Sequence, residues 1–138
     1  MGTNIRPELS GKNKYWIDKH RYYELKHFCL QYPEWKKIYV ATDGYTKKPA
    51  ELFIFSKGNH GDPTAKCAEA REFYSDRIDM VEWCSIEADP ELASYILKGV
   101  TEERSYTYLK TVLHMPCGKD TYYDRYRKFF WLLDKERR

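Results

Sequence analysis

The sequence lacks a long apolar run, and this absence is the first limit on what the chain can be. No stretch of its 138 residues approaches the roughly 20 apolar residues that a membrane-spanning helix requires. Residues 1–16 are polar and contain no apolar core of the kind found in secretory signal peptides. We therefore expect a cytoplasmic protein that does not insert into a membrane.

Cysteine is scarce and never closely paired. The chain contains four cysteines: Cys29, Cys67, Cys84 and Cys117. They form no Cys-x-x-Cys motif, the spacing typical of zinc and dithiol sites. Because no secretion signal accompanies them, we expect reduced thiols with a structural role.

A histidine-rich stretch near the N-terminus offers no complete set of metal ligands. It contains His20, His27 and Cys29. The His-x-Cys spacing does not place both ligands on one face of a helix, and no second pair converges on them. We expect these histidines to be structural or exposed, and we expect no metal site and no cofactor.

Glycine is also sparse, with seven residues, and none of them belongs to a phosphate-binding loop. Residues 56–63, SKGNHGDP, have the glycines of such a loop but lack its Lys-Ser/Thr pair. His60 beside Asp62 would fit acid–base chemistry, and a nuclease using Asp43 or Glu51 is an alternative. Scattered acids of this kind are usually only solubilising, so we expect no catalytic residues and no enzyme.

Aromatic residues, in contrast, are abundant: 13 Tyr, 6 Phe and 4 Trp. Large rings with a polar tip can fill the edge of a core and still meet water. A chain of this length can bury about two-thirds of its unfolded surface, so it needs neither a metal nor a disulfide to fold. We expect one domain, or two small helical lobes that share a core.

Positive charge is concentrated at the C-terminal end. The formal net charge of the chain is only +3, well short of a strongly cationic nucleic-acid binder. Residues 118–138 hold seven Lys or Arg and four Asp or Glu, so this segment carries the whole excess. Any contact with a polyanion is therefore expected here.

Apolar residues recur at helical spacing from Tyr15 onward. The stripe of the first helix is Tyr22, Leu25, Phe28, Cys29 and Tyr32. Pro33 then interrupts the pattern and is expected in the first turn of a second helix, where its missing N–H costs little. That helix would bury Trp35, Ile38 and Tyr39.

Two Asp-Pro pairs mark the starts of further helices, with the aspartate as N-cap and the proline in the first turn. Asp62-Pro63 predicts a helix to about Glu87, and its apolar stripe is Ala70, Phe73, Tyr74, Ile78, Val81 and Cys84. Asp89-Pro90 predicts another helix that ends at Gly99. Between the second and third helices, residues 51–58 fit either a short strand or an extended connector.

The end of the chain predicts two helices separated by a short turn. Ser105 can cap the first, which is expected to reach about His114 with its apolar side chains inward: Tyr106, Leu109, Val112 and Leu113. The turn PCGK, residues 116–119, contains proline and glycine and ends this helix. Asp120 can cap a final helix that extends to about Lys135.

The final helix has two faces, as a recognition helix in DNA-binding proteins requires. Its buried stripe is Tyr122, Tyr126, Phe129, Phe130 and Leu133. The side chains that we expect to meet DNA are Lys119, Thr121, Tyr123, Asp124, Arg125, Arg127 and Lys128. This arrangement predicts a helix-turn-helix that binds double-stranded DNA.

The types of residue suggest a role for several of these side chains. Arg125 is the candidate for a bidentate contact with guanine. Asp124 could accept a hydrogen bond from cytosine, or could orient Arg125 or Lys128. The Thr121 hydroxyl, Arg127 and Lys128 are expected to contact phosphates.

Residues 105–130, SYTYLKTVLHMPCGKDTYYDRYRKFF, resemble the helix-turn-helix of sigma-factor region four. Ser105-Tyr106 matches the start of that pattern, Leu109 and Leu113 match its inward aliphatics, and the segment from Thr121 to Arg125 matches its recognition helix. The turn is about two residues longer than the usual one, and His114 stands where a small residue or glycine is frequent.

The whole chain, with its aromatic N-terminal helices and its closing FFWLLDKERR, is similar to the phage late-transcription regulators of the ArpU and RinA type. This resemblance implies a bacteriophage or prophage protein that acts in the cytoplasm of a bacterial host and regulates late genes. We also expect the N-terminal helices to contact RNA polymerase or a second copy of the chain.

Together these patterns predict an all-α fold, with N-terminal amphipathic helices and a C-terminal helix-turn-helix. We expect a flexible arm over residues 1–14, a helical region over 15–88 and the helix-turn-helix region over 89–138. The alternative function is a protein-binding module that contacts RNA polymerase or a host factor through its aromatic surface without reading DNA. In that case the charged face of the last helix is only solvated.

Overall fold

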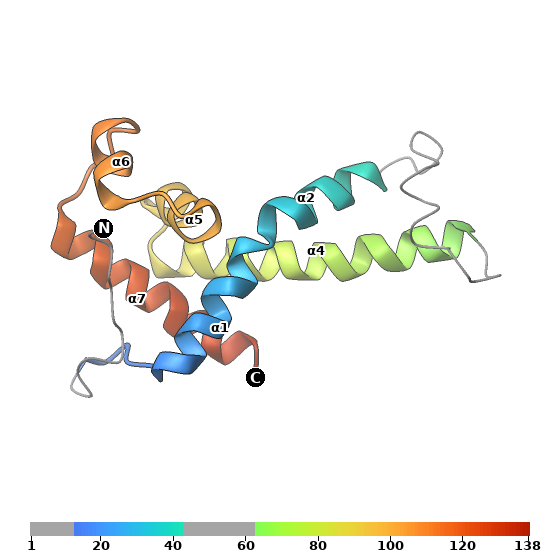
Figure 1. The fold of residues 1–138 in the computed structure, drawn as a ribbon, viewed down its shortest axis with the longest axis horizontal. Coiled ribbons are helices and arrows are strands. Elements are labelled where there is room, and N and C mark those ends of the chain that lie inside the picture. The colour runs from blue at the N-terminus through green and yellow to red at the C-terminus, as the bar shows by residue number, and fades with distance from the viewer. Residues whose placement is uncertain (1–12, 43–62) are drawn as a thin grey trace. The chain divides into compact units, whose positions relative to one another are not determined.

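The computed structural model describes residues 13–42 and 63–138, and these residues form α-helices and no strand (Figure 1). The helices are α1 (Lys19–Leu30), α2 (Tyr32–Ala41), α4 (Pro63–Ala88), α5 (Ala93–Glu102), α6 (Tyr106–Thr111) and α7 (Lys119–Glu136). The predicted all-α class is confirmed for this part of the chain. The predicted Asp62 cap and the ambiguous segment 51–58 lie outside the described residues.

Contacts between residues divide the chain into two compact units. The larger unit takes in the described residues 13–31 and 80–138, and the smaller unit takes in 32–42 and 63–79. Helix α4 contributes its last turns to the larger unit and its first part to the smaller one. Among the described residues, no helix combines the length and the apolarity needed to cross a membrane.

The core of the larger unit lies where α1, α5 and α7 meet. Helix α1 packs against α5 and α7, and α5 packs against both α6 and α7. The large side chains that are 2% exposed or less include Leu25, Val81, Ile96, Leu109, Met115, Tyr122, Phe129, Phe130 and Leu133. The apolar stripe predicted for α7 is buried in this core, and so is the part of the first helix's stripe that lies in α1: Tyr22, Leu25, Phe28 and Cys29. Tyr32, the last residue of that predicted stripe, belongs to α2 and to the smaller unit.

Two cysteines, Cys29 of α1 and Cys84 of α4, are fully buried in the same unit. Burial raises the pKa of the Cys29 thiol well above its usual range and that of Cys84 to about 12. Both groups are therefore neutral at physiological pH and unreactive as nucleophiles. All four cysteines are free thiols, and Cys117 is the one that is partly exposed.

Helix α1 begins later than its apolar pattern suggested. Asp18 has an extended backbone and its carboxylate accepts a hydrogen bond from His20 N at 3.0 Å, so the helix begins at Lys19 instead of Tyr15. Tyr15 and Ile17 are nevertheless buried, in the segment that precedes the helix. The expectation that the helical pattern begins at Tyr15 is therefore wrong, because the Asp18 cap starts the helix four residues later.

The smaller unit is built from α2 and the first part of α4. Pro33 lies in the first turn of α2, as predicted. Tyr32 and Trp35 are buried. Arg71 of α4 stacks on the ring of Tyr39 at 4.1 Å and donates to its carbonyl oxygen at 3.2 Å. The thiol of Cys67 donates to the carbonyl oxygen of Thr42 at 3.3 Å, so a polar link joins α4 to the end of α2.

The predicted stripe of α4 is buried except around its middle. Ala70, Ile78, Val81 and Cys84 are buried, but Phe73 is 46% exposed. Phe73 instead carries the guanidinium of Arg77 on its ring at 3.6 Å. The expectation that Phe73 is a core residue is therefore wrong.

Helix α5 differs from its prediction at both ends. Asp89 caps a turn instead of the helix, because its Oδ1 accepts from Glu91 N and Leu92 N before α5 begins at Ala93. Gly99 lies inside α5 and does not end it. A Cβ at this position would overlap the hydroxyl of Tyr122, so the glycine allows α7 to approach α5 closely.

Helix α6 is shorter than predicted. Ser105 caps it as expected, with its hydroxyl accepting from Tyr108 N at 3.1 Å. The helix ends at Thr111 because the chain leaves it through His114, whose φ of 58° is left-handed. Met115 N then donates to Leu109 O at 3.0 Å, so the chain after the left-handed residue is hydrogen-bonded back onto the helix. Val112, predicted to face inward, is 53% exposed.

Candidate nucleic-acid interface

Helix α7 has one face in the core and one that faces away from it. The buried face consists of Tyr122, Tyr123, Tyr126, Phe129, Phe130, Leu133 and Asp134. The opposite face carries Thr121, Asp124, Arg125 and Lys128, which are exposed or half-buried and recur at helical spacing. The structure therefore brings four of the predicted DNA-contacting residues together on one side of the helix.

Tyr123 does not belong to this outward face. Its side chain is 7% exposed and packs edge-on against Tyr122 and Tyr126, and it also lies near Tyr106. Because α7 is covered by both α1 and α5, its buried face is wider than a single apolar stripe. The expectation that Tyr123 points outward is wrong, and we remove it from the candidate contacts.

Arg125, the predicted guanine reader, is held by two carboxylates. Its Nε donates to Oδ2 of Asp89 at 3.1 Å, and Nη1 bonds with Oδ2 of Asp124. Hydrogen bonding to Asp89 and the charge of Asp124 raise the pKa of the guanidinium. Asp89 itself is fixed by its two backbone bonds, so in this state Arg125 ties α7 to the turn before α5.

Three other predicted contacts present free polar groups. Lys119 and Thr121 are exposed on the first turn of α7, and Lys128 is half-buried two turns later. Within the described residues, no ion pair or hydrogen bond engages these three side chains. They are therefore available to an external partner without the loss of an internal contact.

Arg127 lies beside this face and has a different environment. The side chain is half-buried, and its Nε is a buried atom without a hydrogen-bond partner among the described residues. The Nε of Arg127 is therefore shielded from an external partner. The two Nη nitrogens remain as the atoms that could make the phosphate contact expected from the sequence.

The start of α7 also offers unpaired backbone donors. Gly118 is the N-cap, and no side chain caps the helix, contrary to the expectation for Asp120. Asp120 instead lies in the first turn, where its negative charge interacts favourably with the positive end of the helix dipole. Exposed N–H groups at such a terminus are a common contact for DNA phosphates.

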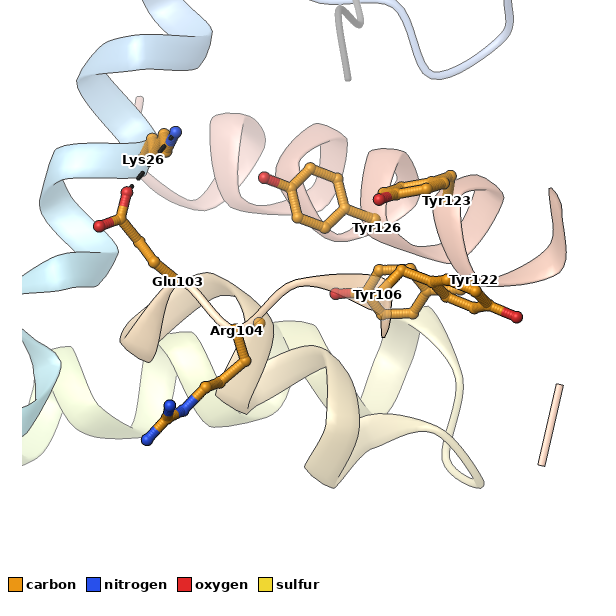
Figure 2. A pocket seen from close by; sticks show the side chains of 8 residues that line it. Lys26, Glu103, Arg104, Tyr106, Tyr122, Tyr123 and Tyr126 are labelled. Carbon is orange, nitrogen blue, oxygen red and sulfur yellow. Dashed lines mark ion pairs between the residues drawn. The ribbon is translucent and has the colours of Figure 1, made fainter. Parts of the chain in front are cut away.

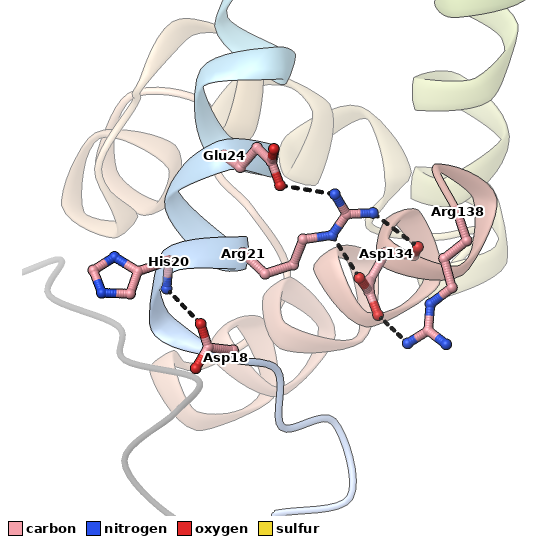
Figure 3. A network of polar contacts seen from close by, with 6 residues as sticks. All are labelled: Asp18, His20, Arg21, Glu24, Asp134 and Arg138. Atoms are coloured by element: carbon pink, nitrogen blue, oxygen red, sulfur yellow. Dashed lines mark hydrogen bonds and ion pairs between the residues drawn. The ribbon is translucent and has the colours of Figure 1, made fainter.

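An ionic network at the other end of α7 sets the position of the helix (Figure 3). Arg21 of α1 donates from Nε to Oδ1 of Asp134 at 2.7 Å and pairs with Glu24 at 2.8 Å. Arg138 donates to the second carboxylate oxygen of Asp134 at 2.8 Å. Burial of the Asp134 carboxyl raises its pKa, but the hydrogen bonds and charges of Arg21 and Arg138 lower the pKa by more. The pKa of this carboxyl therefore lies below its ordinary value.

A hydrogen bond between buried phenols adds to this link between α1 and α7. The hydroxyls of Tyr22 and Tyr126 are 2.8 Å apart, and the ring of Tyr22 meets Phe130 edge-on. Sequence reasoning missed both links. Only the i,i+4 spacing of Asp134 and Arg138 gave a signal, since Arg21 is more than a hundred residues away in the chain.

The connection from α6 to α7 is longer than the sequence suggested. It spans residues 112–118, because α6 ends early, and it is anchored at Met115, which is 1% exposed. The ammonium of Lys110 donates to the carbonyl oxygens of Met115 and Cys117, both at 3.1 Å. The turn is therefore long but well held, and it presents α7 in a defined direction from α6.

Comparisons of this chain with protein-family models, with curated proteins and with solved structures find no match. The residues and their geometry are therefore the whole basis for the functional proposal.

Proposed function

We propose that this chain is a sequence-specific DNA-binding regulator of transcription in which α7 enters the major groove. The observation that carries the proposal is the outward face of α7, which combines uncommitted polar groups with a rigidly buried opposite face. The order of the helices supports it, since α5 packs on both α6 and α7, as the first helix of a three-helix DNA-binding unit does.

The role proposed for each side chain in DNA binding depends on whether it already makes an ion pair or hydrogen bond within the protein. Lys119 and Lys128 neutralise phosphates on either side of the groove, together with the open backbone donors at the start of α7. Thr121, in the first turn of the helix, is placed to meet a base edge or a phosphate through its hydroxyl. Asp124 and Arg125 read bases only when DNA displaces Asp89 from the guanidinium.

The modest charge of this face suggests a need for a second contact. One such module binds DNA weakly, and regulators of this size commonly bind two half-sites as dimers. We propose that a second copy of the chain or RNA polymerase supplies the additional contact. This extends the proposal to the phage late-gene regulators that the sequence pattern resembles.

Equilibrium binding to a fluorescent duplex of mixed sequence tests the proposed face. Lys119→Gln with Lys128→Gln should weaken binding and lower the slope of log K against log salt by roughly 2, because two phosphate contacts are lost. Lys98→Gln is the matched control, since this lysine lies on α5 and forms an exposed ion pair with Glu102 at 3.7 Å. Equal effects of the α5 and α7 variants would contradict the proposal.

A second candidate function, protein binding, is favoured by one apolar feature of the larger unit. Trp83 and Ile86, three residues apart on α4, are 44% and 51% exposed. A pair of this kind can anchor a protein partner. If binding to purified bacterial RNA polymerase is lost in Trp83→Ala with Ile86→Ala while the α7 variants bind normally, protein binding without DNA readout becomes the better account.

A further inference from the structure

The outward face of α7 continues past Lys128 to the last turns of the helix. Lys128, Trp131 and Lys135 recur at intervals of three and four residues, so they lie along one side of α7. Trp131 is half-buried and Lys135 is exposed. The ammonium of Lys135 lies over the Trp131 ring, 3.5 Å from its centroid. The last turns of α7 therefore present a cation on the same side as the proposed DNA contacts.

A second cation reaches this side of α7 from the residues that precede α1. Tyr15 packs edge-on against Trp131, with ring centroids 5.4 Å apart. The ammonium of the exposed Lys14 lies 5.0 Å from the centroid of the Tyr15 ring. Lys14 and Lys135 thus stand at the two ends of one series of contacts that runs through the two rings. No described residue forms an ion pair or a hydrogen bond with either ammonium.

The segment that carries Lys14 is held in a turn. The side-chain oxygen of Asn13 accepts from Tyr15 N at 2.8 Å, and the carbonyl oxygen of Asn13 accepts from Trp16 N at 3.0 Å. Tyr15 and Ile17 are buried, which fixes the segment to the larger unit. Because the backbone at Lys14 is already held, little of its conformational freedom is lost when the ammonium binds a partner.

The acidic side chains at the end of α7 are directed to other elements. Asp134 is paired with Arg21 and Arg138. Glu136 is close to Cys84 of α4: burial raises the pKa of this thiol, and the negative charge of Glu136 adds to the increase. The outward side of these last turns therefore carries no acidic residue that would repel a phosphate.

The length of α7 allows both of its ends to meet DNA. Lys119 and Lys135, near its two ends, are roughly 24 Å apart along the helix axis at about 1.5 Å per residue. The major groove of B-DNA is about 12 Å wide. A helix whose first turn meets the phosphates of one strand therefore reaches the backbone of the other strand with its last turns. The C-terminal end of the recognition helix likewise contacts the DNA backbone in homeodomain complexes.

We propose that Lys14 and Lys135 form a second phosphate-binding site, on the strand opposite the one that meets the first turn of α7. This inference rests on the proposed binding of DNA by α7 and extends the interface to residues before α1. An ammonium above an aromatic ring is held in place and keeps N–H groups free to donate to a phosphate. Since phosphates carry no sequence information, the site adds affinity and orients α7 without changing the base preference.

Equilibrium binding of the full chain to a fluorescent duplex of mixed sequence, over a range of salt concentrations, tests the second site. Lys14→Gln with Lys135→Gln should weaken binding and lower the slope of log K against log salt by roughly 2, because two phosphate contacts are lost. A loss of folded protein would instead weaken binding equally at every salt concentration and leave the slope unchanged. The consensus that this variant selects from a randomised DNA pool should match that of the wild type.

Lys26→Gln with Lys98→Gln is the matched control for the loss of two positive charges. Lys98 of α5 pairs with Glu102 at 3.7 Å, and Lys26 of α1 pairs with Glu103 at 3.8 Å (Figure 2). Lys26 also borders a tyrosine-lined cavity of about 90 Å³, whose rings are those of Tyr106, Tyr122, Tyr123 and Tyr126. Because both ammonium groups are paired within the protein, this variant should bind with a slope close to that of the wild type.

The outcomes separate this inference from the proposed function. A wild-type slope for the variant of Lys14 and Lys135, with a lowered slope for the variant of Lys119 and Lys128, would overturn the second site and leave DNA binding by the first turns of α7. An equal fall of the slope in the matched control would also overturn the second site, because the attraction would then be diffuse. A wild-type chain that binds no duplex even at low salt would refute DNA binding itself, and this site with it.

Discussion

Individual side chains of α7 each join this helix to a different neighbouring element. Asp134 fixes the end of the helix to Arg21 of α1, while Tyr122 faces Gly99 of α5. Arg125 joins the helix to the turn at Asp89. A change at any of these positions therefore alters a contact between two helices, and its effect can be predicted from that contact.

Substitution of Gly99 by alanine is expected to destabilise the protein. Alanine is favoured over glycine inside a helix by about 0.5–1 kcal/mol, but its Cβ would overlap the Tyr122 hydroxyl. Overpacking in a rigid core costs about 1–3 kcal/mol, so a net loss in the free energy of unfolding by urea is expected. The double variant with Tyr122→Phe should recover much of the loss. A single variant more stable than wild type would refute this contact.

The ion pairs of Asp134 should make stability depend on pH in the acid range. The pKa of Asp134 is lower in the folded protein than in the unfolded chain, where it is about 3.9. The pairs with Arg21 and Arg138 therefore stabilise the fold above that value, and the contribution is lost as the pH falls through the lower, folded pKa.

Asp134→Asn isolates this contribution. At neutral pH the variant should lose about 1.5–3 kcal/mol in the free energy of unfolding, the range for hydrogen bonds to charged groups. The difference from wild type should shrink as the pH is lowered below about 4. Asp76→Asn, at an exposed carboxylate in the middle of α4, is the control. A difference for Asp134→Asn that is independent of pH would contradict the role assigned to its charge.

At the scale of helices, periodicity predicted which side chains are buried better than where each helix begins and ends. The stripes of α1 and α7 follow directly from apolar spacing. The ends depend on local bonds that compete with the helix, such as the Asp18 cap and the left-handed turn at His114. Gly99 looked like a helix end because only the fold reveals the Tyr122 hydroxyl beside it.

The turn between α4 and α5 is expected to restrain DNA binding by α7. Asp89→Asn keeps an amide oxygen for the backbone N–H groups of Glu91 and Leu92, but it removes the charge that holds Arg125. If Arg125 then reaches a base, the affinity for a selected duplex should rise more than the affinity for a duplex of mixed sequence.

The same substitution in an Arg125→Gln background provides the control for that prediction. There the gain in affinity should largely vanish, because the cation that Asp89 restrains is absent. An equal gain in both backgrounds would show that Asp89 acts only by repelling the DNA, and the restraint of Arg125 would be rejected.

For the molecule as a whole, the all-α fold class could be predicted from the sequence, but the arrangement of the side chains in space could not. The outward placement of Thr121, Arg125 and Lys128 followed from spacing on one helix. Spacing did not reveal that α7 is covered from two sides, which buries Tyr123, or that Asp89 holds Arg125 from another element. The tyrosine-lined cavity likewise depends on four segments that meet only in the fold.

Selection of duplexes from a randomised DNA pool by the full chain tests the central claim most directly, at physiological salt where nonspecific binding is weak. The account predicts a recovered consensus that is lost, or changed at defined positions, on Thr121→Ala and Arg125→Ala. It also predicts that Tyr15→Phe leaves the consensus intact. A pool without enrichment, and no retained DNA at low salt, would contradict DNA binding by α7 and leave its charged face as a solvated surface.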